Sequence, residues 1–371
     1  MRVGVPTEIK NNEYRVAITP AGVAELARRG HDVVIQAGAG DGSSISDGDF
    51  KAAGAEIVPG AEEVWETTDL LLKVKEPIEP EYELMRESQT LFTYLHLAAS
   101  LPCTEALMRS GTTSIAYETV QTADGALPLL APMSEVAGRL AAQVGSYHLM
   151  RSHGGRGVLM GGVPGVAPAN VVVIGGGMAG LNSARIAKGM GARVTVFDVN
   201  INTLRKVDAE FDGGIETRYS SMLDLEQAVE QADLVIGAVL VPGAKAPKLV
   251  MNSTVAQMKS GAVLVDIAID QGGCFEDSHP TTHDDPTFKV HDTVFYCVAN
   301  MPGAVPRTST YALTNATMPY VIKLADEGWR AACQADAALA KGLSTHEGAL
   351  LNEHVAHDLA LPFTDPATAL A

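Results

Sequence analysis

The sequence lacks long apolar segments, paired cysteines and an excess of basic residues, and each absence excludes a class of protein. No apolar run approaches the roughly 18 residues that a membrane-spanning helix needs. The first residues, MRVGVPTEIKNNEYR, contain no apolar core of the kind found in signal peptides. The cysteines are scattered and form no CxxC pair or zinc-binding spacing with histidine: Cys103, Cys274, Cys297 and Cys333. We therefore expect a soluble, cytoplasmic protein with reduced thiols and no bound metal.

The charge balance is acidic, with 27 Lys and Arg against 44 Asp and Glu and a formal net charge of −17. A surface that binds nucleic acid needs clustered basic residues to contact the phosphates. Nucleic acid is therefore excluded as a partner. A small anionic substrate would need a local basic pocket that opposes this overall charge.

The order of predicted elements indicates two α/β domains, which also suits a chain of 371 residues. Short β-branched runs alternate with helical stretches, as in parallel βαβ units. A Gly/Pro-rich loop at 154–168 follows a long helical stretch at 126–154 and separates two such series. After Arg307 we expect helices without strands, packed back on the first domain. The expected strands are 2–5, 32–36, 70–75, 91–95, 113–117, 171–174, 193–198, 234–239, 263–269 and 294–298.

The most specific local motif is the stretch VVVIGGGMAGLNSARIAKGMGARVTVFD. Gly175, Gly177 and Gly180 follow an apolar strand at GxGxxG spacing and open a helix. This arrangement allows a tight turn, close approach of the backbone to a pyrophosphate, and close packing of helix on strand. The pyrophosphate then meets the N–H groups and the positive dipole end of the helix. The motif predicts a Rossmann-like dinucleotide site.

An acid at the end of the following strand, Asp198, indicates which dinucleotide is bound. A carboxylate there accepts hydrogen bonds from the ribose hydroxyls of NAD and repels the 2′-phosphate of NADP. The alternative is a strand-end acid that only faces solvent. We therefore predict NAD as the cofactor. The first strand of the chain has no such glycine motif, so the first domain is not expected to hold the dinucleotide.

Several further segments resemble alanine dehydrogenase in order and over essentially the whole chain. These are VGVPTEIKNNEYRVAITP, LLKVKEP, LAPMSEVAGRLAAQ, VLVDIAIDQGGCFE and YCVANMPGAVPRTST. The first two are shared in outline with the transhydrogenase α subunit. The resemblance implies two doubly wound domains with a cleft between them, the NAD domain (129–306) being inserted in the catalytic domain (1–128 plus 307–371). It also implies reversible oxidation of L-alanine to pyruvate and ammonia by a homohexamer.

The resemblance also assigns roles to individual residues. It makes Arg15 and Lys75 the substrate-binding residues, and His96 and Asp270 the catalytic ones. Thr203 and His279 stand where family members can carry a basic residue near the cofactor, so neither is included among its ligands. The residues expected to bind the cofactor are Ser134, Gly175, Gly177, Met178, Gly180, Asp198, Ser220, Val239, Leu240, Ile267, Ala268, Ile269, Asp270, Val298, Ala299, Asn300 and Met301.

These residue types suit the chemistry of amino acid oxidation. The planar fork of Arg15 can pair with a carboxylate, and Lys75 offers a point charge for the carboxylate or the carbonyl oxygen. His96 exchanges protons near neutrality. After hydride transfer from the alanine Cα, water activated by His96 or Asp270 would release ammonia; the sequence leaves open which of the two acts. Taken singly, each could instead be a surface, core or loop-capping residue.

Two other functions remain possible from the sequence. One is a transhydrogenase-like NAD-binding subunit, against which His96 argues. The other is a non-catalytic NAD-binding sensor, which would not need the four residues Arg15, Lys75, His96 and Asp270 together. A pocket lined by Met133, Tyr94 and Met301 would suit a small side chain, so glyoxylate is a plausible second substrate, giving glycine, and serine a plausible third.

Overall fold

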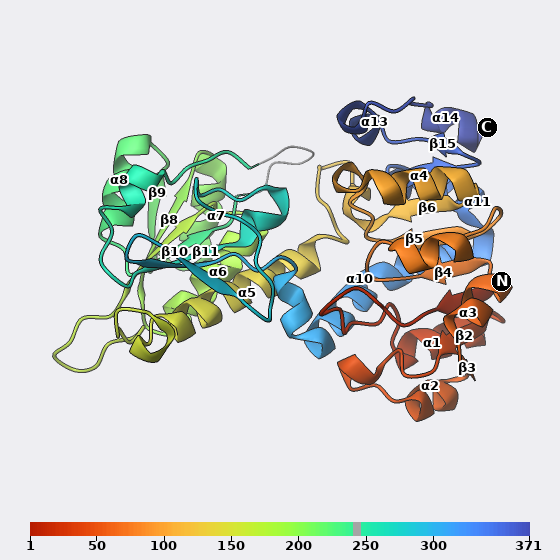
Figure 1. The fold of residues 1–371 in the computed structure, drawn as a ribbon, viewed down its shortest axis with the longest axis horizontal. Coiled ribbons are helices and arrows are strands. Elements are labelled where there is room, and N and C mark those ends of the chain that lie inside the picture. Colours follow the sequence, from red (N-terminus) through yellow and green to blue (C-terminus); the bar gives the residue numbers. More distant parts are fainter. Residues whose placement is uncertain (240–245) are drawn as a thin grey trace. The chain divides into compact units, whose positions relative to one another are not determined.

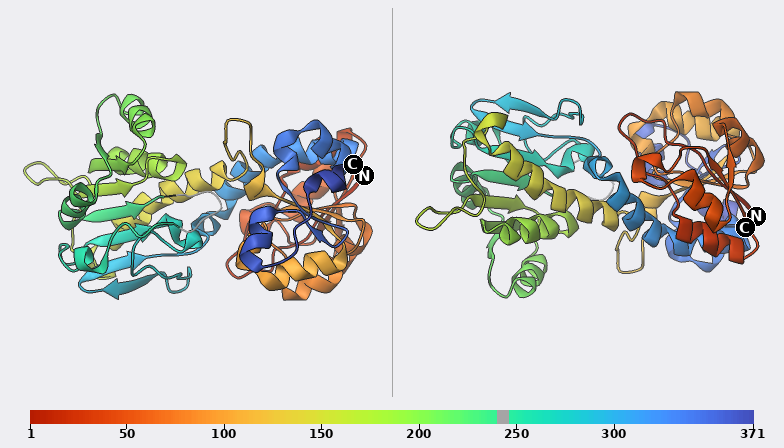
Figure 2. Two further views of the ribbon diagram at one scale, coloured as in Figure 1. Left: turned by 90° about the horizontal axis from the view of Figure 1, so that it is seen from above. Right: turned by 90° about the horizontal axis from the view of Figure 1, so that it is seen from below.

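The computed structural model describes residues 1–239 and 246–371, which form two compact units (Figure 1). Unit 1 contains Met1–Met133 and Val305–Ala371, and unit 2 contains Ser134–Ala304. Each unit has its own largely parallel sheet with helices on both faces, as the views in Figure 2 show. The predicted fold class, two Rossmann-like α/β domains, is confirmed.

The sheet of unit 1 has the strand order β15-β14-β6-β5-β4-β1-β2-β3. Strands β1 to β6 are parallel, and the chain changes direction between β1 and β4, as in a doubly wound sheet. Its strands are β1 (Arg2–Val5), β2 (Asp32–Gln36), β3 (Glu56–Val58), β4 (Leu70–Leu72), β5 (Thr90–Thr93), β6 (Thr113–Ala116), β14 (Leu343–His346) and β15 (Ala349–Leu350). Its helices are α1 (Pro20–Arg28), α2 (Asp47–Ala53), α3 (Ala61–Thr67), α4 (Leu101–Ser110), α10 (Pro306–Glu327), α11 (Trp329–Ala335), α12 (Ala337–Ala340), α13 (Glu353–Leu359) and α14 (Pro366–Leu370).

The sheet of unit 2 has the order β12-β13-β11-β10-β7-β8-β9, with only β12 antiparallel. Its switch point lies between β7 and β10. The strands are β7 (Asn170–Ile174), β8 (Arg193–Asp198), β9 (Glu216–Tyr219), β10 (Leu234–Gly237), β11 (Val263–Asp266), β12 (Thr287–Val290) and β13 (Thr293–Tyr296). The helices are α5 (Ala131–His148), α6 (Met178–Gly189), α7 (Ile201–Glu210), α8 (Met222–Glu230) and α9 (Asn252–Val255).

The expectation that no strand follows Arg307 is wrong. Strand β14 pairs antiparallel with β6, and β15 completes a hairpin at the edge of the sheet. The segment LSTH has no long apolar run that would have marked it. Its buried hydroxyls are instead satisfied across the ladder, where Ser114 Oγ lies 2.7 Å from Thr345 Oγ1 and Thr345 Oγ1 donates to Thr112 O.

Several predicted strands end earlier than expected. Strands β4, β5 and β11 stop at Leu72, Thr93 and Asp266, although apolar residues continue beyond each end. Beyond these points backbone N–H groups donate to carboxylates: Val74 N to Glu8, Leu95 N to Glu118 and Ala268 N to Asp266. Strands β3, β9 and β12 were not predicted.

Helix α5 packs closely on α6 in unit 2. A Cβ added to Gly138 would lie 2.2 Å from Ala179 O, closer than any real contact. Ser183 Oγ donates to Gly138 O at 2.9 Å across the same interface. The absence of a Cβ at Gly138 therefore allows the close distance between the two helices. Helix α6 is also the helix that follows the glycine-rich turn.

We expect Gly138→Ala to lower the free energy of unfolding by about 1–3 kcal/mol, because the added methyl group forces the helices apart. Gly189→Ala in α6 is the matched control. Nothing lies within 4 Å of its added Cβ, so it should be neutral or stabilise by up to about 1 kcal/mol. Chemical denaturation measures both, and equal effects of the two substitutions would contradict the close-packing argument.

Candidate active site

In unit 1 the predicted substrate-side residues follow strands that neighbour one another. Arg15 lies between β1 and α1, Lys75 follows β4, and His96 follows β5. Because these strands are parallel neighbours, the three segments leave the same edge of the sheet. Arg15 and Lys75 flank the switch point between β1 and β4, the place where open α/β sheets bind ligands.

Contacts around Tyr94 join the three segments. Tyr94 N donates to Val74 O, next to Lys75, and Thr93 Oγ1 donates to Lys75 O at 3.0 Å. The Tyr94 ring stacks on the His96 ring with centroids 5.9 Å apart. Tyr94 also lies near enough to Arg15 for the guanidinium charge to act on the pKa of the Tyr94 hydroxyl, lowering it against the effect of burial. Unit 1 therefore brings Arg15, Lys75 and His96 into one region.

The Arg15 side chain is buried and its fork is partly occupied. Its Nε and Nη2 donate to the two oxygens of Glu13 at 2.6 and 2.5 Å, and its Nη1 lies 3.0 Å from Met133 Sδ. Burial alone would lower the pKa of the guanidinium, but the hydrogen bonds and charge of Glu13 hold that pKa above its usual value. Glu13 thus fixes the orientation of the guanidinium. A cavity of about 390 Å³ lies beside it, lined by residues 7–15 with Gly38, Ala39 and Gly42.

His96 has a backbone conformation that is unusual for a residue other than glycine, with φ at 47°. Glu118, which follows β6, holds it there by accepting the N–H groups of His96 at 2.6 Å and of Leu95 at 3.2 Å. His96 Nδ1 lies 4.0 Å from the same carboxylate, and 42% of its side chain is exposed. Strained backbone of this kind is concentrated at functional sites. Nothing in the sequence pattern had indicated a role for Glu118.

The glycine-rich turn of unit 2 has the geometry that a pyrophosphate requires. Gly175 has φ at 98°, and a Cβ on Gly180 would lie 1.7 Å from Gly175 O. Gly177, at the N-cap of α6, has open space where a side chain would be. Asp198 Oδ2 accepts Gly176 N at 2.8 Å and so ties the end of β8 to the turn. The residues present therefore fit a dinucleotide.

The other predicted cofactor residues mostly follow the carboxyl ends of the parallel strands of unit 2. Ser220 follows β9, Val239 follows β10, residues 267–270 follow β11, and residues 298–301 follow β13. Ser134 lies in the first turns of α5, and Met178 begins α6. Leu240 lies outside the described residues.

The sequence placed Asp270 at the end of a strand, and this is wrong. Strand β11 ends at Asp266, and Asp270 lies in a short 3₁₀ turn (Ile267–Gln271). Asp266 is fully buried and accepts Ala268 N, Cys274 N and Ser278 Oγ at 2.6–3.0 Å. Burial raises the pKa of its carboxyl, although these donors lower it. Asp266 therefore holds the turn that carries Asp270, a role that the sequence did not reveal.

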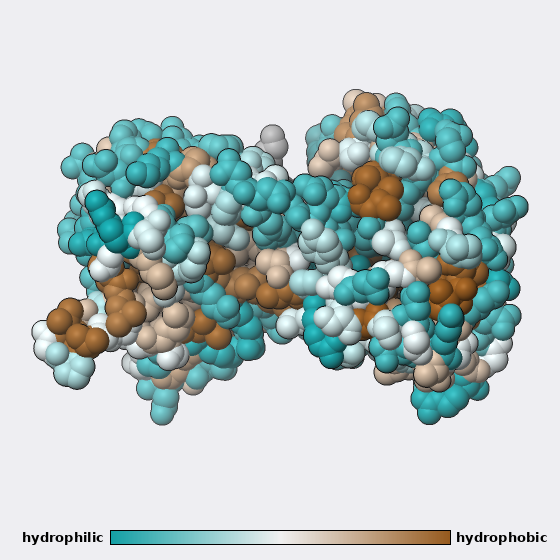
Figure 3. Space-filling model, turned by 60° about the horizontal axis from the view of Figure 1, so that its bottom comes forward, coloured by the Kyte–Doolittle hydropathy of each residue, from teal (hydrophilic) through white to brown (hydrophobic). Residues whose placement is uncertain are grey.

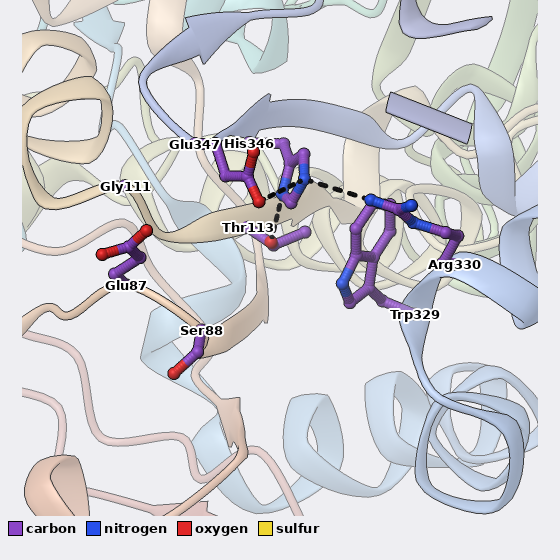
Figure 4. A pocket seen from close by; sticks show the side chains of 8 residues that line it. All are labelled: Glu87, Ser88, Gly111, Thr113, Trp329, Arg330, His346 and Glu347. Carbon is purple, nitrogen blue, oxygen red and sulfur yellow. Dashed lines mark hydrogen bonds and ion pairs between the residues drawn. The ribbon is translucent and has the colours of Figure 1, made fainter. Parts of the chain in front are cut away.

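A larger pocket of unit 1, of about 610 Å³, lies at the opposite edge of the sheet, where β5 and β6 begin (Figure 4). Its lining includes Arg330, which contacts the Trp329 ring, and His346, which lies 2.9 Å from Thr113 Oγ1. Two carboxylates, Glu87 and Glu347, oppose the charge of Arg330. None of the predicted site residues lines this pocket.

The described residues contain neither a membrane-spanning helix nor a metal-binding cluster. Within residues 1–239 and 246–371, no helix has the length and apolar character needed to cross a membrane. In the same ranges, no three His, Cys, Asp or Glu side chains gather as a metal site would require.

The fold and the glycine turn define a class: α/β proteins with two Rossmann-like units, one of which carries a nucleotide-binding turn. Family models match both units, "Alanine dehydrogenase/PNT, N-terminal domain" at residues 4–137 and "Alanine dehydrogenase/PNT, C-terminal domain" at residues 141–353. The chain belongs to the alanine dehydrogenase/PNT family, which confirms the resemblance found in the sequence.

Individual relatives match over the whole chain. It is 81% identical to an alanine dehydrogenase of Mycolicibacterium smegmatis and 76% identical to one of Mycobacterium tuberculosis, covering 100% of each protein. A solved L-alanine dehydrogenase is similar with a TM-score of 0.94 and 51% identity, over 97% of this chain and 99% of that one. A transhydrogenase from Sinorhizobium meliloti shares the fold, with a TM-score of 0.81 and 24% identity over 95% of this chain and 99% of that one.

The pocket of Figure 4 generates a prediction about pH. Burial lowers the pKa of His346 below its usual 6.5; Arg330 lowers it further, and Glu347 partly opposes this. The unfolded chain therefore takes up a proton at higher pH than the native protein, so stability present above about pH 6.5 is lost as the pH falls. His148, whose pKa burial also lowers, acts in the same direction. His346→Gln should reduce the fall in melting temperature between about pH 7.5 and pH 5.5.

The matched control is His357→Gln, because the His357 side chain is 87% exposed. Thermal melts across the pH range measure the effect. An unchanged slope in His346→Gln would show that this histidine is not among the groups that couple stability to pH.

Proposed function

We propose that this protein is an L-alanine dehydrogenase that uses NAD and interconverts L-alanine with pyruvate and ammonia. The observation that carries the activity is the match of curated alanine dehydrogenases over all 371 residues at 81 and 76% identity. The enzyme class predicted from the sequence, an amino acid dehydrogenase, is confirmed. The identity of the cofactor and the roles of individual residues are our proposal.

The glycine turn and the strand ends of unit 2 support NAD as the cofactor. NAD bound there would supply the hydride acceptor for the alanine Cα. Gly175, Gly177 and Gly180 make room for the pyrophosphate, and Asp198 stands where the adenine ribose is recognised. Asp198 also accepts the N–H of Asn200 at 2.8 Å, so its position is fixed before any ligand binds.

In unit 1, Arg15 and Lys75 are proposed to bind the substrate. Arg15, whose guanidinium is oriented by Glu13, is proposed to pair with the substrate carboxylate, and Lys75 to place a positive charge near the substrate oxygens. His96 is the acid–base group, because its side chain is accessible and its backbone is fixed by Glu118. Asp270 is proposed as the second catalytic residue. Either His96 or Asp270 activates the water that releases ammonia.

We also propose a homo-oligomer, with the hexamer suggested by the family resemblance. The loop at 154–168 projects from unit 2 (Figure 2) and exposes 54–63% of Leu159, Val163 and Val166. Figure 3 shows hydrophobic surface on this projecting segment. Exposed apolar side chains that cluster in this way are typical of interfaces. The four cysteines are unpaired and buried, which suits a reducing compartment, and we propose the cytoplasm.

An assay of NADH formation tests the function directly. The protein is mixed with NAD and L-alanine at alkaline pH, and the reverse reaction is run with NADH, ammonium and either pyruvate or glyoxylate. Turnover with alanine and pyruvate supports the proposal. NADH binding without turnover in either direction would favour a sensor, and hydride exchange between nucleotides without alanine would favour a transhydrogenase-like subunit.

We expect His96→Ala to lower kcat at least about 100-fold, because a positioned acid–base group contributes this much or more. Binding of NADH, measured by its fluorescence, should stay within about two-fold of the parent, since unit 2 carries the nucleotide-binding residues. Near-normal turnover in this variant would contradict the role of His96 and leave Asp270 as the acid–base group.

We expect Asp198→Ala to weaken the preference for NAD over NADP by at least about 10-fold in kcat/KM, because the repulsion of the 2′-phosphate is lost. The parent and the variant are compared with both nucleotides at saturating alanine. Equal discrimination by the two proteins would remove Asp198 from the cofactor site.

A further inference from the structure

A group of three buried charges lies at the end of β4, and the chemistry described above does not use it. Lys73 Nζ donates to Glu8 Oε2 at 3.1 Å and to Glu81 Oε1 at 2.7 Å. The Lys73 side chain is fully buried, and those of Glu8 and Glu81 are 3 and 5% exposed. Two carboxylates and one ammonium thus share the interior of unit 1.

Stability alone does not account for such a group, because the cost of removing charges from water can exceed their mutual attraction. Burial by itself would lower the pKa of Lys73, but the two carboxylates hold it above its usual value. Burial also raises the pKa of Glu8, against the effects of Lys73 and of Val74 N–H. The attraction between the Lys73 ammonium and the carboxylates of Glu8 and Glu81 therefore opposes the cost of burying them.

Each of the two carboxylates also accepts backbone N–H groups, but at different places: Glu81 accepts Ile78 N at 3.1 Å, whereas Glu8 accepts groups at Lys75. Glu8 Oε1 accepts Val74 N at 2.6 Å and Lys75 N at 3.4 Å. Strand β4 has already ended at Leu72, so the regular ladder no longer holds these groups. On the other side of the peptide, Lys75 O accepts Thr93 Oγ1 at 3.0 Å. The backbone of Lys75 is therefore fixed by side chains at both its N–H and its carbonyl.

We propose that Glu8 is a positioning residue: its carboxylate, oriented by Lys73, fixes the backbone that carries Lys75 at the substrate site. Glu8 also belongs to the segment that ends at Arg15 and lines the same cavity, and its charge acts on Arg15 as well. One buried carboxylate thus links the two proposed substrate-binding residues. This inference rests on the proposed role of Lys75 in binding alanine.

The experiment compares Glu8→Gln with Glu81→Gln in the full-length enzyme. Each substitution removes one negative charge from the same buried group and leaves Lys73 paired with the other carboxylate, so both proteins should fold. In both variants the new amide nitrogen must face Lys73 or a backbone N–H, and both are donors. The backbone N–H affected is that of Val74 or Lys75 in Glu8→Gln and that of Ile78 in Glu81→Gln, so only Glu8→Gln disturbs the backbone of Lys75. Glu81→Gln is therefore the matched control.

We expect Glu8→Gln to lower kcat/KM for L-alanine by at least about 10-fold, mainly through KM for alanine, while KM for NAD changes by less than about two-fold. Glu81→Gln should stay within about three-fold of the parent for both substrates. Melting temperatures of both variants are measured alongside, and Glu8→Asp tests whether a shorter carboxylate recovers part of the loss.

Two results would overturn the inference. One is an equal loss of kcat/KM in Glu8→Gln and Glu81→Gln, which would mean that the charge group acts only on stability. The other is a Glu8→Gln enzyme whose KM for alanine matches that of the parent. A parent protein without alanine turnover would contradict the proposed function instead, and the two failures are thereby distinguished.

Discussion

The site depends on carboxylates that hold backbone segments just after parallel strands end. Beyond a strand end, N–H groups lose their partners in the ladder and still require acceptors. Glu8 accepts them beside Lys75, Glu118 beside His96, Asp266 beside Asp270, and Asp198 at the glycine turn. A hydrogen bond to an ionised carboxylate is stronger than one to a neutral acceptor. Each proposed catalytic or binding segment is thereby held by one acid.

These acids also affect how a negatively charged substrate can be bound. The chain carries a formal charge of −17, and Glu13 offsets the charge of Arg15 directly through two short hydrogen bonds. If Arg15 binds the substrate carboxylate as proposed, recognition depends on a guanidinium that is already oriented rather than on excess positive charge. The neighbouring ammonium of Lys73 is neutralised by Glu8 and Glu81, so the proposed substrate site takes its remaining positive charge from Lys75.

Six parallel strands follow the same order in both units, but the units differ in the loop that follows the first of these strands. In unit 2, Gly175 turns the chain within a few residues into α6, and the helix N-terminus faces the open space at Gly177. In unit 1, the segment between β1 and α1 is long enough to carry both Glu8 and Arg15. Both loops lie at a switch point of a doubly wound sheet. The same architecture therefore offers a nucleotide site in one unit and charged side chains for a small acid in the other.

The sequence by itself determined the features that depend on local pattern. The alternation of strands and helices gave the fold class, and glycine spacing marked the turn at 175–180, because each depends on neighbouring residues. Segments with preserved order identified the family and singled out Arg15, Lys75 and His96.

Only the tertiary structure decided where the strands end and what holds the chain beyond them. Strand β11 stops at Asp266 because that carboxylate, and not a neighbouring strand, accepts the next N–H groups. Glu118 reaches His96 from the turn that follows β6, 22 residues later in the chain, and β14 pairs with β6 across more than two hundred residues. Such partners have no local signature, since they are chosen by the geometry of the completed sheet.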